Sequence, residues 1–386
     1  MSSPALWIWL STPRGLPAGA VPALLEAFGS PTEIYAAATA ELAEALGAPA
    51  AAETFASRDL TEADRILGEC AAKGLSVVTL QDASYPDRLR SIEDPPAVLY
   101  VKGRLPAFDL YPAVAVVGTR KASGYGLYAA KTIAAELADA GVIVVSGMAA
   151  GCDAAAHSGA LSQGGATVAV LGCGADVCYP RENQKLYRDI PVQGAVVSEY
   201  PPGTAPVAKH FPVRNRILSG LCNGVLVAEA AARSGSLITA EYALAQGRDV
   251  YAVPGNIDNP ASAGCNALIQ QGAKLVTCGR DILDELLPLY GRQMSLRPVA
   301  GISAENDPYL AGNAFPVFQP APGEDAAGSG SAEERIRTLL KNGRMALDDI
   351  IGASGLGSDE IGAALTLLEL DGAVRPLPGG IFELAE

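Results

Sequence analysis

The spacing of apolar residues over the first 75 positions is typical of short amphipathic helices. In residues 21–28, 32–46 and 61–74, apolar positions recur every three to four residues. This spacing puts the apolar side chains on one face of a helix. Gly residues separate the segments and act as turn signals. The pattern predicts a small helical bundle over residues 1–75, of SAM-like or helix-hairpin-helix type.

Residues 76–289 follow a different pattern, in which short continuous apolar runs alternate with amphipathic stretches. The runs predict strands at 114–118, 142–147, 167–172, 195–198, 224–228, 250–255 and 274–277. Near-continuous apolar strands separated by helices indicate a parallel sheet that is covered on both faces. The fold class is therefore α/β, with a Rossmann-like, doubly wound, mostly parallel sheet.

The pattern changes again in the last hundred residues. Residues 290–330 contain five prolines and end in a stretch rich in Gly, Ala and Ser, which predicts a flexible linker. Residues 331–386 contain three helical patterns and end in two short β runs around Gly379 and Gly380, which predicts a winged-helix domain. The third of these helices carries Asp359, Glu360 and Glu369 but no base, so a protein contact or a regulatory role is favoured over DNA binding.

The acidic charge of the chain lies at its two ends. The 42 acidic and 28 basic residues give a net charge of −14. Nine acids and three bases fall in residues 1–70, and twelve acids and five bases fall in residues 324–386. The intervening segment is nearly neutral, with 21 acids and 20 bases. The charge excludes a uniformly basic nucleic-acid-binding coat but leaves room for a local basic site in the middle.

Targeting, membrane and metal signals are lacking in the sequence. The N-terminus has no basic region before a long apolar run, and no stretch reaches about 18 apolar residues, so we expect neither a signal peptide nor a membrane span. The seven cysteines are scattered and form no CxxC pair. We expect reduced thiols, no metal site and a cytoplasmic location.

Candidate binding residues gather where the predicted strands end, because ligands of open α/β sheets bind outside the carboxyl ends of the strands. Lys121 and Ala122 replace glycines that a dinucleotide fingerprint requires, so no nicotinamide cofactor is expected. Turns with accessible amides, hydroxyl groups and an Arg still suit phosphate. The candidates are Gly118, Thr119 and Arg120 after the first strand, Ser146, Gly147 and Gly151 after the second, and Ser234, Gly235 and Ser236 further on.

The segment from 209 to 216 is the most distinctive candidate. It contains Lys209, Phe211, Arg214, Asn215 and Arg216, and no acid occurs anywhere from 204 to 228. Bases that hold phosphates and a ring that stacks on a nucleobase are the composition of a single-stranded nucleic-acid site. The alternative is a solvated basic loop, or arginines held in salt bridges.

Two further pairs allow a functional and a structural interpretation. Tyr179 and Arg181 offer stacking and charge, or else anchor a loop. Asp153 and His157 lie four residues apart at a predicted helix start, so a hydrogen bond between them is expected. The structural interpretation of that pair is favoured because no nucleophile lies beside it. No catalytic residue is assigned.

Several long motifs resemble the DprA/Smf family. The motifs occur in one order over roughly residues 80–280. They are GTR at 118–120, SGMAAGCDAAAH at 146–157, GGATVAVLGCGADVCYPREN at 164–183, SEYPPG at 198–203, FPVRNRILSGL at 211–221, EAAARSGSLITAEYA at 229–243, AVPGN at 252–256 and GCNALIQQGA at 264–273.

The resemblance implies a recombination mediator of natural transformation, which binds and protects incoming single-stranded DNA and helps to load RecA. It also implies a homodimer and no enzymatic activity. The family's DNA pocket maps onto Arg120, Lys209, Phe211, Arg214 and Arg216. The alternative is a Rossmann-like enzyme that cleaves nucleoside monophosphates, with Glu229 and Glu241 as its acids, although that group's PGG-x-GT signature is replaced here by SGSLIT.

Overall fold

The computed structural model divides the chain into two compact units, residues 1–317 and 318–386. It describes residues 2–12 and 16–294 of the first unit. In the second unit it describes 332–341, 343–346, 350, 353–354, 361, 364–365, 368, 373–377 and 381–384.

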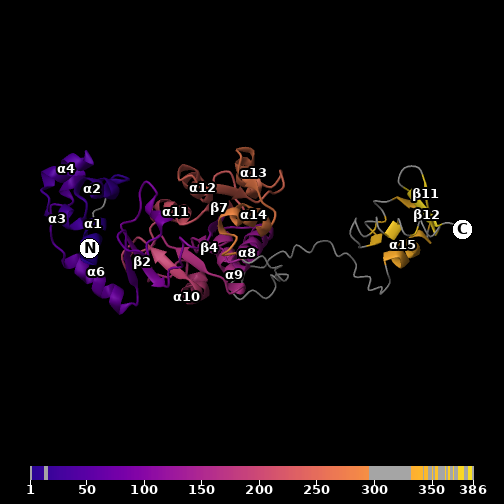
Figure 1. Ribbon diagram of the computed structural model, residues 1–386, viewed down its shortest axis with the longest axis horizontal. Coiled ribbons are helices and arrows are strands. Elements are labelled where there is room, and N and C mark those ends of the chain that lie inside the picture. The colour runs from indigo at the N-terminus through magenta and orange to yellow at the C-terminus, as the bar shows by residue number, and fades with distance from the viewer. Residues whose placement is uncertain are drawn as a thin grey trace. The chain divides into compact units, whose positions relative to one another are not determined.

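A nine-stranded sheet forms the centre of the first unit (Figure 1). Its order is β1-β2-β6-β5-β4-β3-β7-β8-β9. The strands are β1 (Ser76–Thr79), β2 (Val98–Gly103), β3 (Ala113–Val117), β4 (Ile143–Ser146), β5 (Thr167–Val170), β6 (Ala195–Ser198), β7 (Gly224–Val227), β8 (Asp249–Ala252) and β9 (Lys274–Leu275).

The sheet is doubly wound, as the sequence predicts. From β3 the chain winds outward through β4 and β5 to β6, returns to the middle, and continues through β7 and β8 to β9. All of these neighbours pair in parallel. The direction of winding therefore changes between β3 and β7, which is where such folds bind ligands.

The seven predicted strands are all confirmed, but β1 and β2 were not predicted from the sequence. These two strands pair antiparallel with each other, and β2 pairs antiparallel with β6. No helix of the alternating pattern separates β2 from β3, so the βαβ period that identified the other strands does not extend to them.

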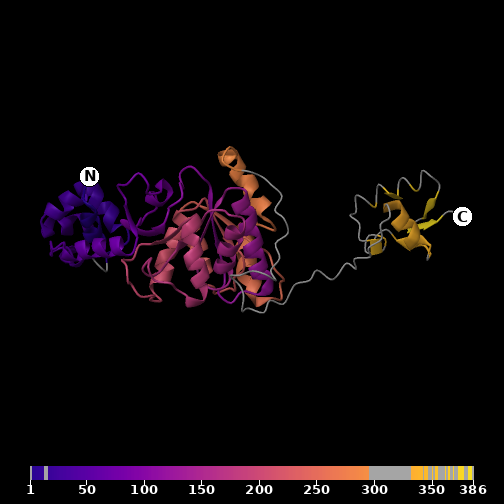
Figure 2. The ribbon, with the colours of Figure 1, turned by 90° about the horizontal axis from the view of Figure 1, so that it is seen from below.

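Helices cover both faces of the sheet (Figure 1), and Figure 2 looks onto one of these two faces. One face packs against α8 (Gly124–Asp139), α9 (Cys152–Ser162), α10 (Gln184–Gln193) and α14 (Gly279–Tyr290). The other packs against α7 (Asp87–Arg90), α11 (His210–Gly220), α12 (Ser236–Ala245) and α13 (Ala263–Gln270). Short 3-10 helices, η1 (Arg181–Asn183) and η2 (Pro260–Ser262), precede α10 and α13.

The N-terminal segment is helical, as predicted. It consists of α1 (Pro4–Ser11), α2 (Ala20–Phe28), α3 (Pro31–Ala36), α4 (Thr39–Leu46), α5 (Pro49–Glu53) and α6 (Thr61–Ala72). Their buried residues, such as Ile8, Leu24 and Ile66, belong to the same hydrophobic cluster as one face of the sheet. The domain boundary near residue 76 and the SAM-like type stay predictions.

The second unit contains α15 (Ala332–Leu340) and a three-stranded sheet of order β10-β12-β11. Its strands are β10 (Met345–Ala346), β11 (Val374–Leu377) and β12 (Ile381–Leu384). Antiparallel pairing of β11 with β12 is consistent with the predicted wing. Most of the predicted third helix, including Asp359, Glu360 and Glu369, lies outside the described residues, as do Gly379 and Gly380.

Candidate nucleic-acid interface

The ends of β3, β4 and β7 converge on one closely packed edge. The amide of Thr119 donates to the carbonyl of Glu229 over 2.8 Å, and the amide of Cys152 donates to the carbonyl of Thr119 over 3.3 Å. Gly151 has φ +80°, and a Cβ there would lie 2.7 Å from the carbonyl oxygen of Arg120. Only glycine fits this contact, so Gly151 positions the turn that carries Arg120.

Phe211, at the start of α11, lies at the centre of an aromatic and cationic cluster at this edge. The Arg120 guanidinium carbon is 5.3 Å from the Phe211 ring centroid, and the Tyr179 ring is 5.6 Å from it at an interplanar angle of 39°. Phe211 is half-buried, whereas Arg120 is exposed and 37% of Tyr179 is exposed. We call Arg120, Tyr179 and Phe211 the aromatic cluster; its residues come from the loop after β3, the loop after β5 and the start of α11.

The loop before Phe211 is fixed by aromatic stacking. The rings of Tyr200 and His210 are 4.1 Å apart and nearly parallel, and His210 Nδ1 lies 3.2 Å from the carbonyl oxygen of Gly172. Phe211 itself packs on Gly172, where a Cβ would lie 3.0 Å from Phe211 Cδ1. Lys209 is exposed, and like Arg120 it forms no ion pair among residues 16–294. Arg120, which lies over the half-exposed ring, and Lys209, two residues before it in the sequence, are therefore both available to a ligand.

Two buried residues of opposite charge, Arg214 and Asp153, lie close to the aromatic cluster, each bonded to backbone groups. Arg214 is 4% exposed, donates from Nη1 to the carbonyls of Gly147 (3.1 Å) and Val170, and has its guanidinium carbon 6.0 Å from the Phe211 ring. Asp153 accepts hydrogen bonds from the amides of Gly147 and Ala149. Burial raises the pKa of Asp153 to about 6, and the positive charge of Arg214 opposes that rise. Burial likewise lowers the pKa of Arg214 to about 10.

Arg216 is held in salt bridges, which is one of the alternatives that the sequence left open. Its guanidinium pairs with Glu199 at 2.7 Å and with Asp94 at 3.0 Å, and the side chain is 9% exposed. Asn215, also buried, accepts from Arg214 Nε over 3.3 Å. The structure thus gives Arg216 and Asn215 structural partners within the protein and leaves Lys209, Phe211 and Arg120 at the surface.

The serines divide between buried and accessible positions. Ser146 is fully buried and donates to the carbonyl of Val116 over 2.6 Å, so its hydroxyl is directed into the fold. Ser234 Oγ and Ser236 Oγ are 2.8 Å apart at the start of α12, where Ser236 is buried and Gly235 is exposed. No contact among the described residues joins this Ser234–Ser236 turn to the aromatic cluster.

The predicted hydrogen bond between Asp153 and His157 is wrong. His157 Nδ1 is paired with Thr167 Oγ1 at 2.8 Å, and its Nε2 is buried without a partner. Burial, together with the positive charge of Arg214, lowers the pKa of His157 to about 3. The helical spacing placed both residues near one helix start, but Asp153 binds the backbone of the preceding turn instead.

Glu229, the acid that an enzymatic interpretation requires, has structural partners. It is 2% exposed and accepts from the amide of Ser123 (2.7 Å) and from its hydroxyl (2.5 Å). Ser123 in turn caps α8 by accepting from the amide of Gly126. Among the described residues no group of three His, Cys, Asp or Glu side chains is arranged to hold a metal ion.

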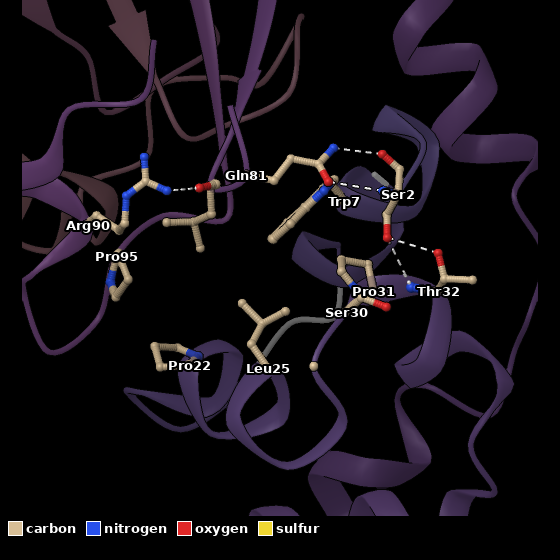
Figure 3. Close-up of a pocket in the computed structure, with 12 residues that line it drawn as sticks. Ser2, Trp7, Pro22, Leu25, Ser30, Pro31, Thr32, Gln81, Arg90 and Pro95 are labelled. Atoms are coloured by element: carbon tan, nitrogen blue, oxygen red, sulfur yellow. Dashed lines mark hydrogen bonds between the residues drawn. The ribbon is translucent and has the colours of Figure 1, made fainter. Parts of the chain in front are cut away.

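A cavity of about 470 Å³ lies away from this edge, between the N-terminal helices and residues 80–95 (Figure 3). Trp7, Leu25 and Pro31 contribute apolar walls. Its one charged lining residue, Arg90, donates to the backbone carbonyls of Leu80, Asp82 and Tyr85. Because these hydrogen bonds occupy the Arg90 guanidinium, the cavity does not offer a phosphate site.

Three residues that shape the interface were not predicted from the sequence. Tyr200 stacks on His210, Gly172 supports Phe211, and Asp176 connects two loops. Tyr179 was considered only together with Arg181 and now belongs to the aromatic cluster. A Tyr or Asp in a loop carries no periodic signal, so only the spatial arrangement identifies these residues.

Fold and site together define a doubly wound α/β protein that presents an aromatic ring and unpaired cations at the carboxyl edge of its sheet. The family model for DNA recombination-mediator protein A matches residues 76–287, and the model for the DprA winged helix domain matches residues 319–380. The chain belongs to the DNA recombination-mediator protein A family, also known as DprA/Smf.

Individual relatives agree with this assignment. DNA processing protein DprA of Streptococcus pneumoniae is 49% identical over 207 residues, which cover 54% of this chain and 73% of the relative. Protein Smf of Synechocystis is 36% identical over 329 residues, covering 82% and 81% of the two chains.

Two solved structures resemble the fold. The X-ray structure of DprA from Streptococcus pneumoniae gives a TM-score of 0.65 at 39% identity and covers 74% of this chain and 99% of that one. DprA from Helicobacter pylori, described for its single-stranded DNA binding mode, gives 0.51 at 30% identity and covers 56% and 98%. No helix in the described part of this chain is long and apolar enough to span a bilayer.

Proposed function

We propose that this chain binds single-stranded DNA across the carboxyl edge of its sheet and acts as a recombination mediator that helps to load RecA. The observation that carries the proposal is the half-exposed Phe211 ring between Arg120 and Tyr179. A ring stacks on any nucleobase, and unpaired cations hold the phosphates, so this arrangement suits a strand of any sequence. The single-stranded DNA binding mode described for DprA from Helicobacter pylori supports the proposal.

The contact residues in this proposal are a subset of the predicted ones. Arg120, Lys209 and Phe211 contact DNA directly, with the Gly118–Thr119 turn beside them. Arg214 contributes its positive charge from beneath the ring. The buried residues Ser146, Asn215 and Arg216 hold the backbone in place, and the Ser234–Ser236 turn provides a separate phosphate contact.

Binding of a labelled oligonucleotide, followed by fluorescence anisotropy at several salt concentrations, tests the site. Phe211→Ala is expected to cost about 1–3 kcal/mol, roughly 5- to 150-fold in affinity, because a stacking platform is removed. Arg120→Ala is expected to weaken binding to all sequences and to reduce the log–log salt slope by about 0.7 for each phosphate that the variant no longer neutralises.

Arg65→Ala is the matched control, because Arg65 is exposed on α6 and paired with Glu62 and Glu69. If Arg120→Ala and Phe211→Ala bind as tightly as this control, the site assignment fails. If the wild-type protein does not bind at low salt and instead releases free base from a nucleoside monophosphate, the enzymatic alternative replaces the proposal.

The mediator role needs a second measurement. We propose that the protein acts as a homodimer, and we expect it to shorten the lag before RecA assembles on a single-stranded template, as followed by DNA-dependent ATP hydrolysis. Arg120→Ala is expected to restore the lag, because the mediator must hold the strand to present it. If the wild-type protein leaves the lag unchanged, the proposed RecA loading is contradicted, whereas the proposed DNA binding is not. Natural transformation and a cytoplasmic location belong to this same proposal.

A further inference from the structure

We propose that Asp176 is a positioning residue of the interface: it holds together the loop that carries Tyr179 and the loop that leads to Phe211, and it joins both to the N-terminal helical segment through Lys73. This inference rests on the proposed function, because it names what keeps the DNA-binding surface in shape. Asp176 itself contacts no part of the aromatic cluster.

The two loops meet around the Asp176 carboxylate. Residues 171–180 follow β5, and residues 199–209 connect β6 to α11. Asp176 Oδ1 accepts from the amide of Gly203 over 2.8 Å. Next to this bond, the amide of Gly174 donates to the carbonyl of Thr204 over 2.9 Å. The carboxylate therefore fixes one loop to the other, three residues before Tyr179 and eight residues before Phe211.

Close packing leaves the carboxylate little freedom. A Cβ at Gly174 would lie 2.6 Å from Asp176 Oδ1 and 2.9 Å from the amide nitrogen of Gly203. Only a glycine lets the two loops come this close. The side chain of Asp176 is 16% exposed, so its two oxygens have few waters to replace a missing protein partner.

The second carboxylate oxygen reaches the N-terminal helical segment. Lys73, directly after α6, places Nζ 2.8 Å from Asp176 Oδ2. Burial raises the pKa of Asp176, but the hydrogen bonds from Lys73 and from the amide of Gly203 outweigh that effect, and the pKa is lowered overall. The ionised form is thus the one that the surroundings stabilise, and it links three segments that lie far apart in the sequence.

Whether the removal of Asp176 weakens or tightens DNA binding distinguishes a positioning role from simple electrostatic repulsion. A carboxylate near a phosphate-binding surface repels DNA, so its removal by itself tightens binding. If Asp176 positions the loops, its removal weakens binding instead, because Tyr179 and Phe211 lose their fixed separation. The salt slope stays unchanged, since the cations that neutralise the phosphates are all retained.

The test compares Asp176→Ala, Asp176→Asn and Lys73→Met in the full-length chain. Asp176→Ala is expected to weaken oligonucleotide binding 3- to 10-fold at an unchanged salt slope, and to speed amide hydrogen exchange in residues 171–180 and 199–209. Asp176→Asn, which keeps an acceptor for Gly203, is expected to recover most of the affinity. Lys73→Met is expected to show a smaller effect in the same direction. Asp284→Ala, which breaks the Arg280–Asp284 pair on α14, is the control.

Two results would overturn the inference: Asp176→Ala binds DNA as tightly as the wild type or more tightly, or exchange in both loops stays at the control rate. Hydrogen exchange needs no DNA. If the wild-type protein fails to bind the oligonucleotide, the proposed function fails, and the exchange rates still decide whether Asp176 holds the loops.

Discussion

At the scale of single residues, the arginines of the 214–216 segment show what sequence cannot distinguish. Arg214 and Arg216 stand two positions apart in a stretch without acids, yet both are buried. The partners of Arg216, Asp94 and Glu199, come from distant parts of the chain. Local charge counting predicted an uncompensated basic loop, whereas long-range pairing neutralises one of its cations and leaves Lys209 exposed.

Replacing Arg216 tests its structural role. Arg216→Met is expected to lower the free energy of unfolding by about 3–5 kcal/mol, because it leaves the mostly buried Glu199 without a partner. Urea denaturation measures the loss. Arg65→Met, which removes two exposed ion pairs, is expected to cost less than about 1 kcal/mol. Equal losses in the two variants contradict the buried pair.

His157 gives a prediction about pH. Its pKa is lowered from 6.5 to about 3 by burial and by Arg214, so the unfolded chain takes up this proton at a higher pH than the folded chain does. The stability that a neutral His157 contributes is therefore present above about pH 6.5 and lost as the pH falls toward 3. The loss amounts to up to about 5 kcal/mol. His157→Gln is expected to flatten the stability curve between pH 6.5 and 4 in urea denaturation; parallel curves would refute the assignment.

At the scale of helices and strands, the sequence predicts an element well where the repeating pattern of apolar residues is strong. The seven parallel strands have continuous apolar runs bounded by helices, and all seven are present. The antiparallel strands β1 and β2 lie outside that alternation and were missed. The turns at strand ends were predicted as a group, because the carboxyl ends of parallel strands share one edge. Their side-chain contacts, such as Tyr179 with Phe211, depend on three-dimensional loop paths that no local pattern specifies.

The turn after β5 supports the ring of Phe211 and can be tested directly. Gly172→Ala places a Cβ about 3.0 Å from Phe211 Cδ1, so the half-exposed ring must shift. We expect DNA affinity to fall roughly 3- to 10-fold, a part of the stacking energy of about 1–3 kcal/mol, with little change in stability. Gly68→Ala in α6, where an added Cβ meets nothing within 4 Å apart from its own helix backbone and chain neighbours, is the control and is expected to stabilise the helix by about 1 kcal/mol. Unchanged binding by Gly172→Ala would show that the ring position does not matter.

At the scale of the whole molecule, the two compact units separate the proposed DNA surface from the acidic C-terminal region. Every residue of the aromatic cluster and of its support belongs to the first unit, residues 1–317. Residues 324–386 carry twelve acids against five bases. This distribution favours a protein-facing role for the second unit, because its net charge repels a phosphate backbone.

Deleting residues 324–386 tests this division of roles. Because the deletion removes net negative charge and no proposed DNA contact, single-stranded DNA affinity is expected to stay within about twofold near physiological salt and to rise at low salt, where charges are less screened. The effect on RecA assembly is measured in the same preparation by the lag in DNA-dependent ATP hydrolysis. Retained DNA binding with an altered lag assigns the second unit a partner-directed role. A large loss of DNA affinity would instead place part of the DNA site in the acidic unit and refute the division.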